Sequence, residues 1–242
     1  MPLYIGTSGF ANKTWKPAFY PADLPATRFL QYYAERLTAL EVNYTFRSLL
    51  TASVAARWIA ETPATFQFIP KAHMRITHSE KLKDESGFLQ AFLDRLEPLR
   101  AAQRLGPILF QLPPGFHCDP GRLAAFLLKC PPGYRCAFEF RDPSWFNEEV
   151  YAIVRRHGAT LCFAESKDLV TPRVYTAPYA YFRMRQPPYE EPQLKELAGV
   201  VSEGLKHLQD VYVFFKHEDD PRGVLSARDF LRVLENRAAA PE

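Results

Sequence analysis

The amino-acid sequence predicts one TIM-like (β/α)8 barrel that occupies residues 1–242 as a single domain. Eight strand-like runs alternate with helix-like runs, and strict alternation of this kind indicates a parallel sheet. The chain has 242 residues, a usual length for one closed barrel. No linker, internal repeat or low-complexity segment divides it. A doubly wound open sheet is the alternative architecture.

Each expected strand is short, rich in aromatic, β-branched or aliphatic residues, and bordered by glycine, proline or polar residues. Such runs alternate with segments long enough for a covering helix, as a barrel requires. The expected strands are Leu3–Ser8, Ala39–Thr45, Phe66–Lys71, Pro107–Leu112, Arg135–Arg141, Thr160–Glu165, Tyr179–Arg183 and Val211–Lys216.

The helical runs between these strands have recognisable ends. Asp119 offers an N-cap side chain, and Pro120 follows as a first helical residue that needs no backbone donor. Asn147 offers a second N-cap, and Gly158 is a suitable stop for the helix that Asn147 begins. Residues 166–178 are too short and too interrupted by proline for a full helix, so we expect one irregular unit after the sixth strand. The last helix carries an apolar stripe at Ala227, Phe230, Leu231 and Leu234.

The composition is that of a globular protein, with 47% hydrophobic and 24% charged residues. The 30 Lys and Arg residues nearly balance the 27 Asp and Glu residues, so the net charge of +3 supports nucleic-acid binding only weakly. No apolar run approaches the roughly 20 residues that cross a bilayer. The first residues lack the basic and apolar regions of a signal peptide. We therefore expect a cytoplasmic protein without a membrane partner.

Polar and charged residues gather late in the expected strands, which is where TIM-like barrels build their active sites. They fall in one of the two alternating phases of each strand. Because unpaired buried charges are costly, such a set must be mutually paired, solvated or bound to a ligand. The candidate catalytic residues are Glu139, Glu41, Lys71, Glu165 and His78. The candidate substrate-binding residues are Thr7, Ser8, Trp15, Asn43, Gln111, Arg141, Tyr181, Arg183 and Lys216.

Several of these residues have a purely structural alternative. Glu139 and Arg141 form, in that alternative, an ion pair that holds the barrel rim. Trp15 lies in the loop after the first strand, where it either stacks on a ligand or packs the loop onto the core. The run Gly6-Thr7-Ser8-Gly9 either offers backbone N–H groups to an anion or forms an ordinary turn.

No motif requires a cofactor or a metal ion. The cysteines show no Cys-x-x-Cys spacing, and we expect Cys136 and Cys162, out of phase with the polar strand positions, to be small buried hydrophobic residues. His73, His78 and His217 together with the glutamates offer a divalent-metal site as a less favoured alternative. No His-x-His or His-Glu-x-x-His spacing supports such a site.

Motifs of one known family run in order along nearly the whole chain. They include Gly6-Thr7-Ser8-Gly9-Phe10, Glu41-Val42-Asn43-Tyr44-Thr45-Phe46, Trp58, Lys71, Ile76-Thr77-His78, Phe110-Gln111-Leu112-Pro113-Pro114, Glu139-Phe140-Arg141, Tyr181 and Arg183. The chain resembles the YecE-like family, domain-of-unknown-function family seventy-two. This resemblance implies a TIM-type barrel and supplies no established reaction. The chain departs from the family at Lys216-His217 and at Met184-Arg185, where many relatives have Asn-Asn and His-Gly, which puts ligand contacts at those positions in doubt.

The residues favour an acid–base enzyme, a hydrolase or an isomerase, that acts on a small anionic or polyhydroxylated substrate. Arg141, Arg183 and Lys71 would bind the anion, and Glu139 or Glu41 would be the general acid or base. Lys71 would form a Schiff base if its pKa were lowered. One alternative is a protein that binds or processes nucleic acid or a phosphate ligand without a basic surface groove. The other is a non-catalytic ligand-binding barrel.

Overall fold

The protein folds into a nearly closed barrel of eight parallel strands, which confirms the predicted architecture. The structure is a computed structural model and describes residues 2–165, 169–186, 188–216 and 219–239. The strands are β1 (Leu3–Thr7), β2 (Ala39–Val42), β3 (Gln67–Pro70), β4 (Ile108–Gln111), β5 (Cys136–Glu139), β6 (Thr160–Ala164), β7 (Tyr179–Met184) and β8 (Asp210–Phe215). Their order is β3-β2-β1-β8-β7-β6-β5-β4. Two parallel bridges, Phe68 with Leu105 and Lys71 with Leu109, bring the two edges together.

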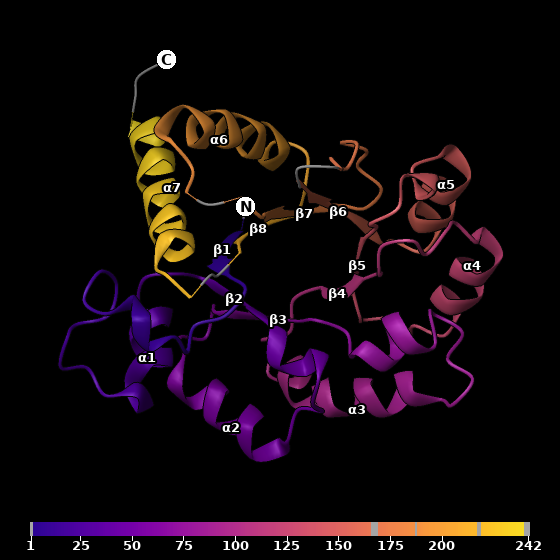
Figure 1. The fold of residues 1–242 in the computed structure, drawn as a ribbon, viewed down its shortest axis with the longest axis horizontal. Coiled ribbons are helices and arrows are strands. Elements are labelled where there is room, and N and C mark those ends of the chain that lie inside the picture. Colours follow the sequence, from indigo (N-terminus) through magenta and orange to yellow (C-terminus); the bar gives the residue numbers. More distant parts are fainter. Residues whose placement is uncertain (1, 166–168, 187, 217–218, 240–242) are drawn as a thin grey trace.

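Helices form an outer ring around the strands (Figure 1). They are α1 (Phe29–Ala34), α2 (Ala52–Glu61), α3 (Phe88–Ala101), α4 (Pro120–Leu128), α5 (Glu148–Arg156), α6 (Glu191–Leu205) and α7 (Arg222–Ala239). The described residues between β6 and β7 contain no helix, as expected for the irregular unit. Over the described ranges, none of these helices combines the length and apolarity needed to traverse a bilayer.

The predicted helix caps are present. The Asp119 side chain accepts a hydrogen bond from the backbone N–H of Arg122, 2.9 Å away, and begins α4. The Asn147 side chain accepts from the N–H of Val150 at 3.0 Å and begins α5. Gly158, with φ of +62°, follows the end of α5 in the left-handed conformation that glycine tolerates best. Each such cap contributes about 0.5–2 kcal/mol, so local sequence fixes the ends of α4 and α5.

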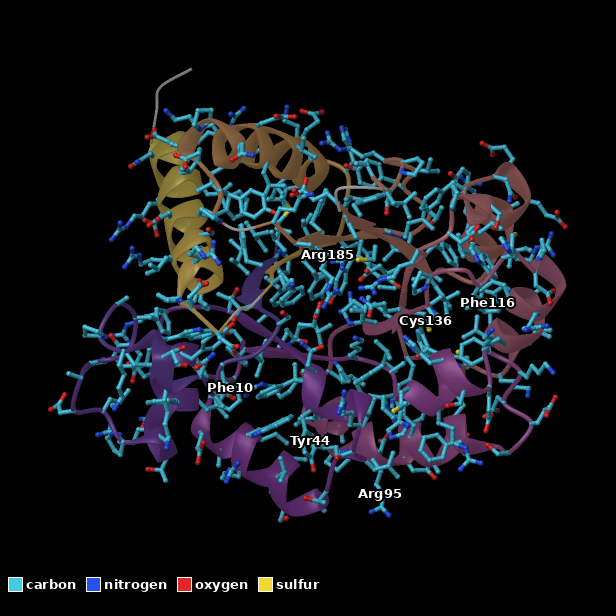
Figure 2. The ribbon with its side chains drawn as sticks, in the orientation of Figure 1. Phe10, Tyr44, Arg95, Phe116, Cys136 and Arg185 are labelled. Atoms are coloured by element: carbon cyan, nitrogen blue, oxygen red, sulfur yellow. The ribbon has the colours of Figure 1, made fainter. Side chains whose placement is uncertain are left out.

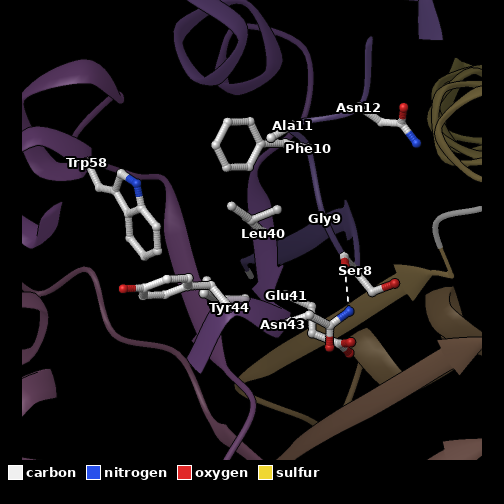
Figure 3. A pocket seen from close by; sticks show the side chains of 11 residues that line it. Ser8, Gly9, Phe10, Ala11, Asn12, Leu40, Glu41, Asn43, Tyr44 and Trp58 are labelled. Atoms are coloured by element: carbon white, nitrogen blue, oxygen red, sulfur yellow. Dashed lines mark hydrogen bonds between the residues drawn. The ribbon is translucent and has the colours of Figure 1, made fainter. Parts of the chain in front are cut away.

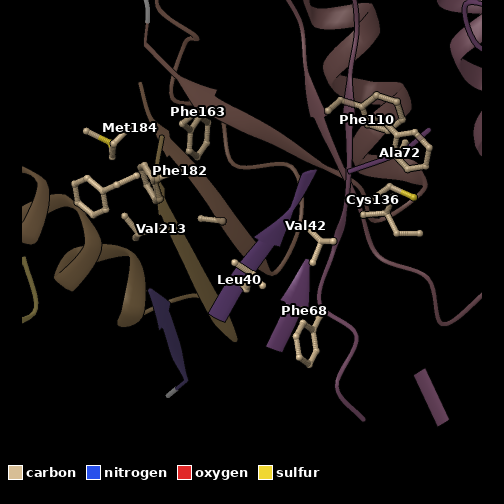
Figure 4. Packing of buried hydrophobic residues seen from close by; sticks show 14 of the residues in the cluster. Leu40, Val42, Phe68, Ala72, Phe110, Cys136, Phe163, Phe182, Met184 and Val213 are labelled. Atoms are coloured by element: carbon tan, nitrogen blue, oxygen red, sulfur yellow. The ribbon is translucent and has the colours of Figure 1, made fainter. Parts of the chain in front are cut away.

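Alternate residues of each strand pack into two separate apolar cores, one on each face of the sheet. The larger core lies between strands and helices, and Figure 4 shows Leu40, Val42, Phe68 and Phe110 among its members. The smaller core fills the barrel interior. Its buried residues are Ala39, Ile69, Leu109, Ala137, Cys162, Ala164, Tyr179, Tyr181, Tyr212 and Phe214. Cys136 is buried in the outer core and Cys162 in the inner one, so both are buried as expected, although Cys162 shares the inward phase.

The second strand is shorter than the sequence pattern predicts. β2 ends at Val42, and residues Asn43–Phe46 form a 3-10 turn. The Thr45 hydroxyl stabilises this turn by donating to the carbonyl oxygens of Val42 and Lys71, at 2.9 and 2.8 Å. The turn therefore releases Asn43 and the residues after it from strand alternation and directs them over the end of the barrel.

A glycine sets the close approach of β1 to β2. Gly6 pairs with Ala39, and a Cβ atom at Gly6 would lie 1.9 Å from the Ala39 carbonyl oxygen and 2.9 Å from the Tyr33 hydroxyl. The Tyr33 hydroxyl donates to that same carbonyl at 3.0 Å and accepts from the N–H of Thr7 at 2.7 Å. Tyr33 of α1 thus joins the two strands at a point where only glycine fits.

We predict opposite effects for two glycine-to-alanine changes. Gly6→Ala forces β1 away from β2 and should lower the free energy of unfolding by at least about 1–3 kcal/mol. Gly121→Ala in α4 places its Cβ 3.8 Å from the nearest atom and should be neutral or stabilising by up to about 1 kcal/mol, because alanine favours helices. Urea unfolding of the two variants measures both effects, and equal stability of the two would contradict this view of the β1–β2 contact.

Candidate functional site

The buried guanidinium of Arg183 joins two glutamates inside the C-terminal end of the barrel. Its Nε and Nη2 atoms donate to the Glu41 carboxylate over 2.7–3.1 Å, and its Nη1 donates to Glu139 Oε2 at 3.0 Å. The three side chains come from β7, β2 and β5, and each is no more than 6% exposed. Tyr181 adds a hydroxyl donor to Glu41 Oε2 at 2.7 Å. Both carboxylates are therefore paired with one shared cation and hydrogen-bonded in place.

Glu139 receives further donors that hold it ionised. Gln111 Nε2 donates to its Oε2 at 2.9 Å, and Arg141 Nε donates to its Oε1 at 3.0 Å. Arg185 Nη1 lies 3.6 Å from Oε1. Burial opposes ionisation of this carboxyl, but Arg183, Arg141, Arg185 and Gln111 outweigh it and lower the pKa of Glu139 to about 2. The surrounding donors therefore favour the ionised form of Glu139 at neutral pH.

Above this network opens a cavity of about 310 Å³, which we call the cationic cavity. Its lining residues are Ser8, Asn43, Phe46, Arg47, Lys71, Gln111, Arg141, Arg183, Arg185 and Lys216. Six of these side chains are cations, and within the described part of the chain none is a carboxylate. Figure 2 places Arg185 near the middle of the ring of strands. A second opening beside it contains Glu139, Arg141 and Arg185.

Lys71 is the cation whose protonation the site alters most. It follows β3, and its Nζ lies 4.1 Å from the centre of the Phe46 ring. Burial and the positive charge of Arg183 lower its pKa to about 8, although Glu41 and Glu139 oppose the shift. A fraction of the Lys71 amine is therefore neutral just above physiological pH, as a general base or a nucleophile requires.

His78 lies beside Lys71, on a π-helical turn over Arg75–Ser79. Its ring meets the Phe46 ring edge to face at 5.1 Å, and its Nδ1 is 2.9 Å from the Thr77 hydroxyl. Burial, followed by the charges of Lys71 and Arg141, lowers the pKa of His78. Phe46 therefore contacts Lys71 on its face and lies next to His78. The lowered pKa favours the neutral form of the His78 imidazole.

The structure brings most of the predicted site residues together. Those in the wall of the cationic cavity are Ser8, Asn43, Lys71, Gln111, Arg141, Arg183 and Lys216. Glu41, Glu139 and Tyr181 form the hydrogen-bonded floor below Arg183. His78 stands next to the wall through Phe46.

Three predicted site residues lie elsewhere. The Thr7 hydroxyl faces the helices, where it donates to the Gly9 carbonyl at 2.6 Å and contacts the Tyr33 hydroxyl at 2.9 Å. Trp15 is fully buried against Phe19 and Tyr20, so its ring is not available to stack on a ligand.

Glu165 also lies away from the cationic cavity, because Cys162 and Ala164 take the inward phase of β6 and leave Glu165 in the outward phase. It lies on the helix side of the barrel, next to Phe163 and Phe182. Its Oε1 accepts a hydrogen bond from the Tyr189 hydroxyl at 2.5 Å. The carboxylate therefore belongs to the contact between β6 and the segment before α6.

The sequence reasoning missed three cavity residues: Phe46, Arg47 and Arg185. Arg185 lies two positions after Arg183, so extending the alternation of β7 by one step would have found it. Arg47 and Phe46 belong to the turn after β2, where no strand alternation applies.

The metal alternative gains no support from the described residues. No group of three or more His, Cys, Asp or Glu side chains among them is arranged to hold an ion. His73 is turned toward α3, where its ring lies 4.9 Å from that of Phe88. His217, the third histidine of that alternative, lies outside the described residues.

We predict that Arg183→Met destabilises the fold in a pH-dependent way. Removing the arginine leaves two buried carboxylates without a charge partner, which costs about 3–5 kcal/mol at pH 7. The deficit relative to wild type should shrink toward pH 4, because the unpaired carboxyls of the variant then take up protons while wild type begins to lose the benefit of its low-pKa Glu139. Denaturant unfolding at several pH values measures this deficit.

Arg141→Met is the matched control, because Arg141 also donates to Glu139 but keeps 26% of its side chain exposed. We expect it to cost about 1 kcal/mol. Equal losses for the two variants, independent of pH, would contradict the central position of Arg183.

Comparisons with known proteins agree with the resemblance found in the sequence. Residues 4–242 match the family described as "Protein of unknown function DUF72". The crystal structure of a DUF72 family protein from Thermotoga maritima has a TM-score of 0.84 and 30% identity, covering 97% of this chain and 100% of that one. A structure described as AsfvAP:AG covers 97% of this chain and 98% of its own, with a TM-score of 0.61 and 8% identity, and this likeness concerns the fold alone.

A curated relative, the UPF0759 protein YunF of Bacillus subtilis, is 31% identical over 155 residues. That match covers 62% of this chain and 54% of YunF, so the chain spans about half the length of this relative. From the nearly end-to-end family match and the shared barrel, the chain belongs to the DUF72 family of TIM-like barrels, a family of unknown function.

Proposed function

We propose that this protein is an acid–base enzyme that acts on a small phosphorylated substrate in the cationic cavity. The observation that carries the proposal is the imbalance of charge at the strand ends. Six cations line the cavity, whereas the floor holds two carboxylates, which two of these six cations, Arg183 and Arg141, already engage. A dianionic phosphate offsets this excess and offers acceptors to several of the cations at once.

The division of roles differs from the one expected for the carboxylates. Glu41 and Glu139 hold Arg183 and are positioning residues in this proposal, since their oxygens already accept four and three hydrogen bonds respectively. Lys71 is the proton-transferring residue, because its pKa of about 8 lies near the working pH. His78, close to Lys71 and Arg141, is the second group able to exchange a proton there.

The alternative functions differ in what they require of the cations. A nucleic-acid-binding protein needs cations spaced along an extended groove to follow successive phosphates. Here Lys71, Arg141 and Arg185 converge on one cavity at the barrel end, which suits a compact anion better. A non-catalytic binding barrel needs the same cations but gains nothing from a lysine of lowered pKa.

We predict that sulfate binding weakens as the pH rises through about 8. Sulfate keeps its charge across this range, so the loss reflects deprotonation of Lys71, whose folded pKa is about 8. Lys71→Met should lower the affinity at pH 7 by roughly tenfold, the value of one charge-assisted hydrogen bond. It should also flatten the pH dependence between pH 7 and 9. Isothermal titration calorimetry at constant ionic strength measures both.

Lys195→Met, an exposed lysine of α6, is the control and should leave sulfate binding unchanged. Unaltered affinity in Lys71→Met would refute an anion site at this cavity. Phosphorus NMR of a panel of phosphate esters then separates an enzyme from a binding protein: wild type should convert at least one ester that Lys71→Met leaves intact. Binding of esters without conversion of any would favour the non-catalytic barrel.

A further inference from the structure

A second cavity, of about 270 Å³, adjoins the cationic cavity on the side of β2 and α2. Apolar and aromatic side chains supply much of its wall, and Figure 3 shows the rings of Phe10, Tyr44 and Trp58 around a common space beside Leu40. We call this the aromatic pocket. Flat rings of this kind provide stacking surfaces for a planar, weakly polar group, and Glu41 adds one carboxylate to the wall.

The two cavities meet at two polar residues, which we call the polar neck. Ser8 and Asn43 line both of them. Asn43 Nδ2 donates to the Ser8 carbonyl at 2.6 Å, the contact drawn as a dashed line in Figure 3. A ligand that occupies both cavities would pass the hydroxyl and amide groups of these two residues.

The aromatic pocket also contains a buried donor from which no described residue accepts a hydrogen bond. Trp58 is 5% exposed, and its Nε1 has no hydrogen-bond partner among the described residues. The indole is held in place by stacking on Phe68, with ring centres 5.2 Å apart. In Figure 3 the ring edge with the nitrogen is turned toward Phe10 and Leu40. A buried indole N–H without an acceptor is unfavourable, so a ligand acceptor at this position would be stabilising.

These observations define the chemistry of one ligand, on the basis of the function proposed above. We propose that the substrate is a nucleoside 5′-phosphate. Its base lies between Phe10, Tyr44 and Trp58, and an acceptor atom of the base receives the Trp58 N–H. Its sugar lies at the neck formed by Ser8 and Asn43, and its phosphate lies among the cations. The order of apolar, polar and cationic walls matches the order of base, sugar and phosphate.

We predict that AMP binds at least tenfold more tightly than ribose 5-phosphate, because only AMP has a base to stack. Tyr44→Ala should weaken AMP binding by roughly tenfold through loss of stacking. Trp58→Phe should weaken it by about two- to tenfold through loss of one hydrogen bond. Neither change should alter the affinity for ribose 5-phosphate or sulfate. Calorimetric titration of the full-length chain measures all of these affinities.

Tyr175→Ala is the matched control, since Tyr175 is 41% exposed against 46% for Tyr44 and does not line either cavity. It should leave every affinity unchanged. Because Tyr44 is exposed, its variant tests the pocket even where Trp58→Phe fails to fold.

AMP binding no tighter than ribose 5-phosphate would overturn the nucleotide assignment, while retained sulfate binding would keep the phosphate-site proposal intact. Absence of binding by sulfate and by both esters would overturn both proposals. A short single-stranded oligonucleotide that binds tenfold more tightly than AMP, and loses that advantage in Tyr44→Ala, would replace the free nucleotide with a nucleic-acid strand.

Discussion

The ion network of Arg183 with Glu41 and Glu139 is the constraint on which the strand ends of this barrel depend. Three charges from β7, β2 and β5 lie where water scarcely reaches, and burial of this kind is tolerated only when each charge is paired and hydrogen-bonded. The geometry satisfies this requirement, because Arg183 spans both carboxylates and Arg141 donates to Glu139 Oε1, the one oxygen that Arg183 does not reach. Tyr181 and Gln111 add one further hydrogen bond to each carboxylate. The three strands are thereby joined across the barrel, above an apolar interior that could not solvate any one of the charges alone.

This pairing of charges determines the character of the space above it. With the carboxylates engaged by Arg183, the surrounding cations face a cavity that lacks negative charge of its own among the described residues. Burial lowers the pKa of Lys71, and the positive charge of Arg183 lowers it further. The positive cavity and the reactive lysine thus follow from the same arrangement. The aromatic pocket, reached past Ser8 and Asn43, adds a different chemistry at the edge of the same site.

Alternation along the strands allowed most of this to be predicted from the sequence. It correctly predicted that Glu41, Gln111, Glu139 and Arg183 point toward the barrel interior, because alternate residues of a regular strand point to the same face. It failed for Glu165, where a polar residue at the strand end was read as the inward phase although the small Cys162 and Ala164 occupy the interior.

Residues outside regular strands were less accessible to this reasoning. The turn that follows β2 places Phe46 and Arg47 by its own hydrogen bonds, and no sequence period encodes that. Trp58 appeared only as part of a family motif, since a tryptophan in a helix gives no sign that its N–H lacks an acceptor. Ion pairs between distant strands could not be predicted from the sequence either. The pair of Glu139 with Arg141, two residues apart, was foreseen and is present, but nothing in the sequence indicated that Arg183 pairs with both glutamates.

The most direct test of the account is the anomalous scattering of selenate soaked into crystals of the wild-type protein. We expect a selenium peak in the cationic cavity, within hydrogen-bonding distance of at least two of Lys71, Arg141 and Arg185, while Arg183 remains on both glutamates. An ordered cavity without selenate, or an Arg183 that leaves Glu41 to bind the anion, would contradict the claim that this network of paired charges supports a separate anion site.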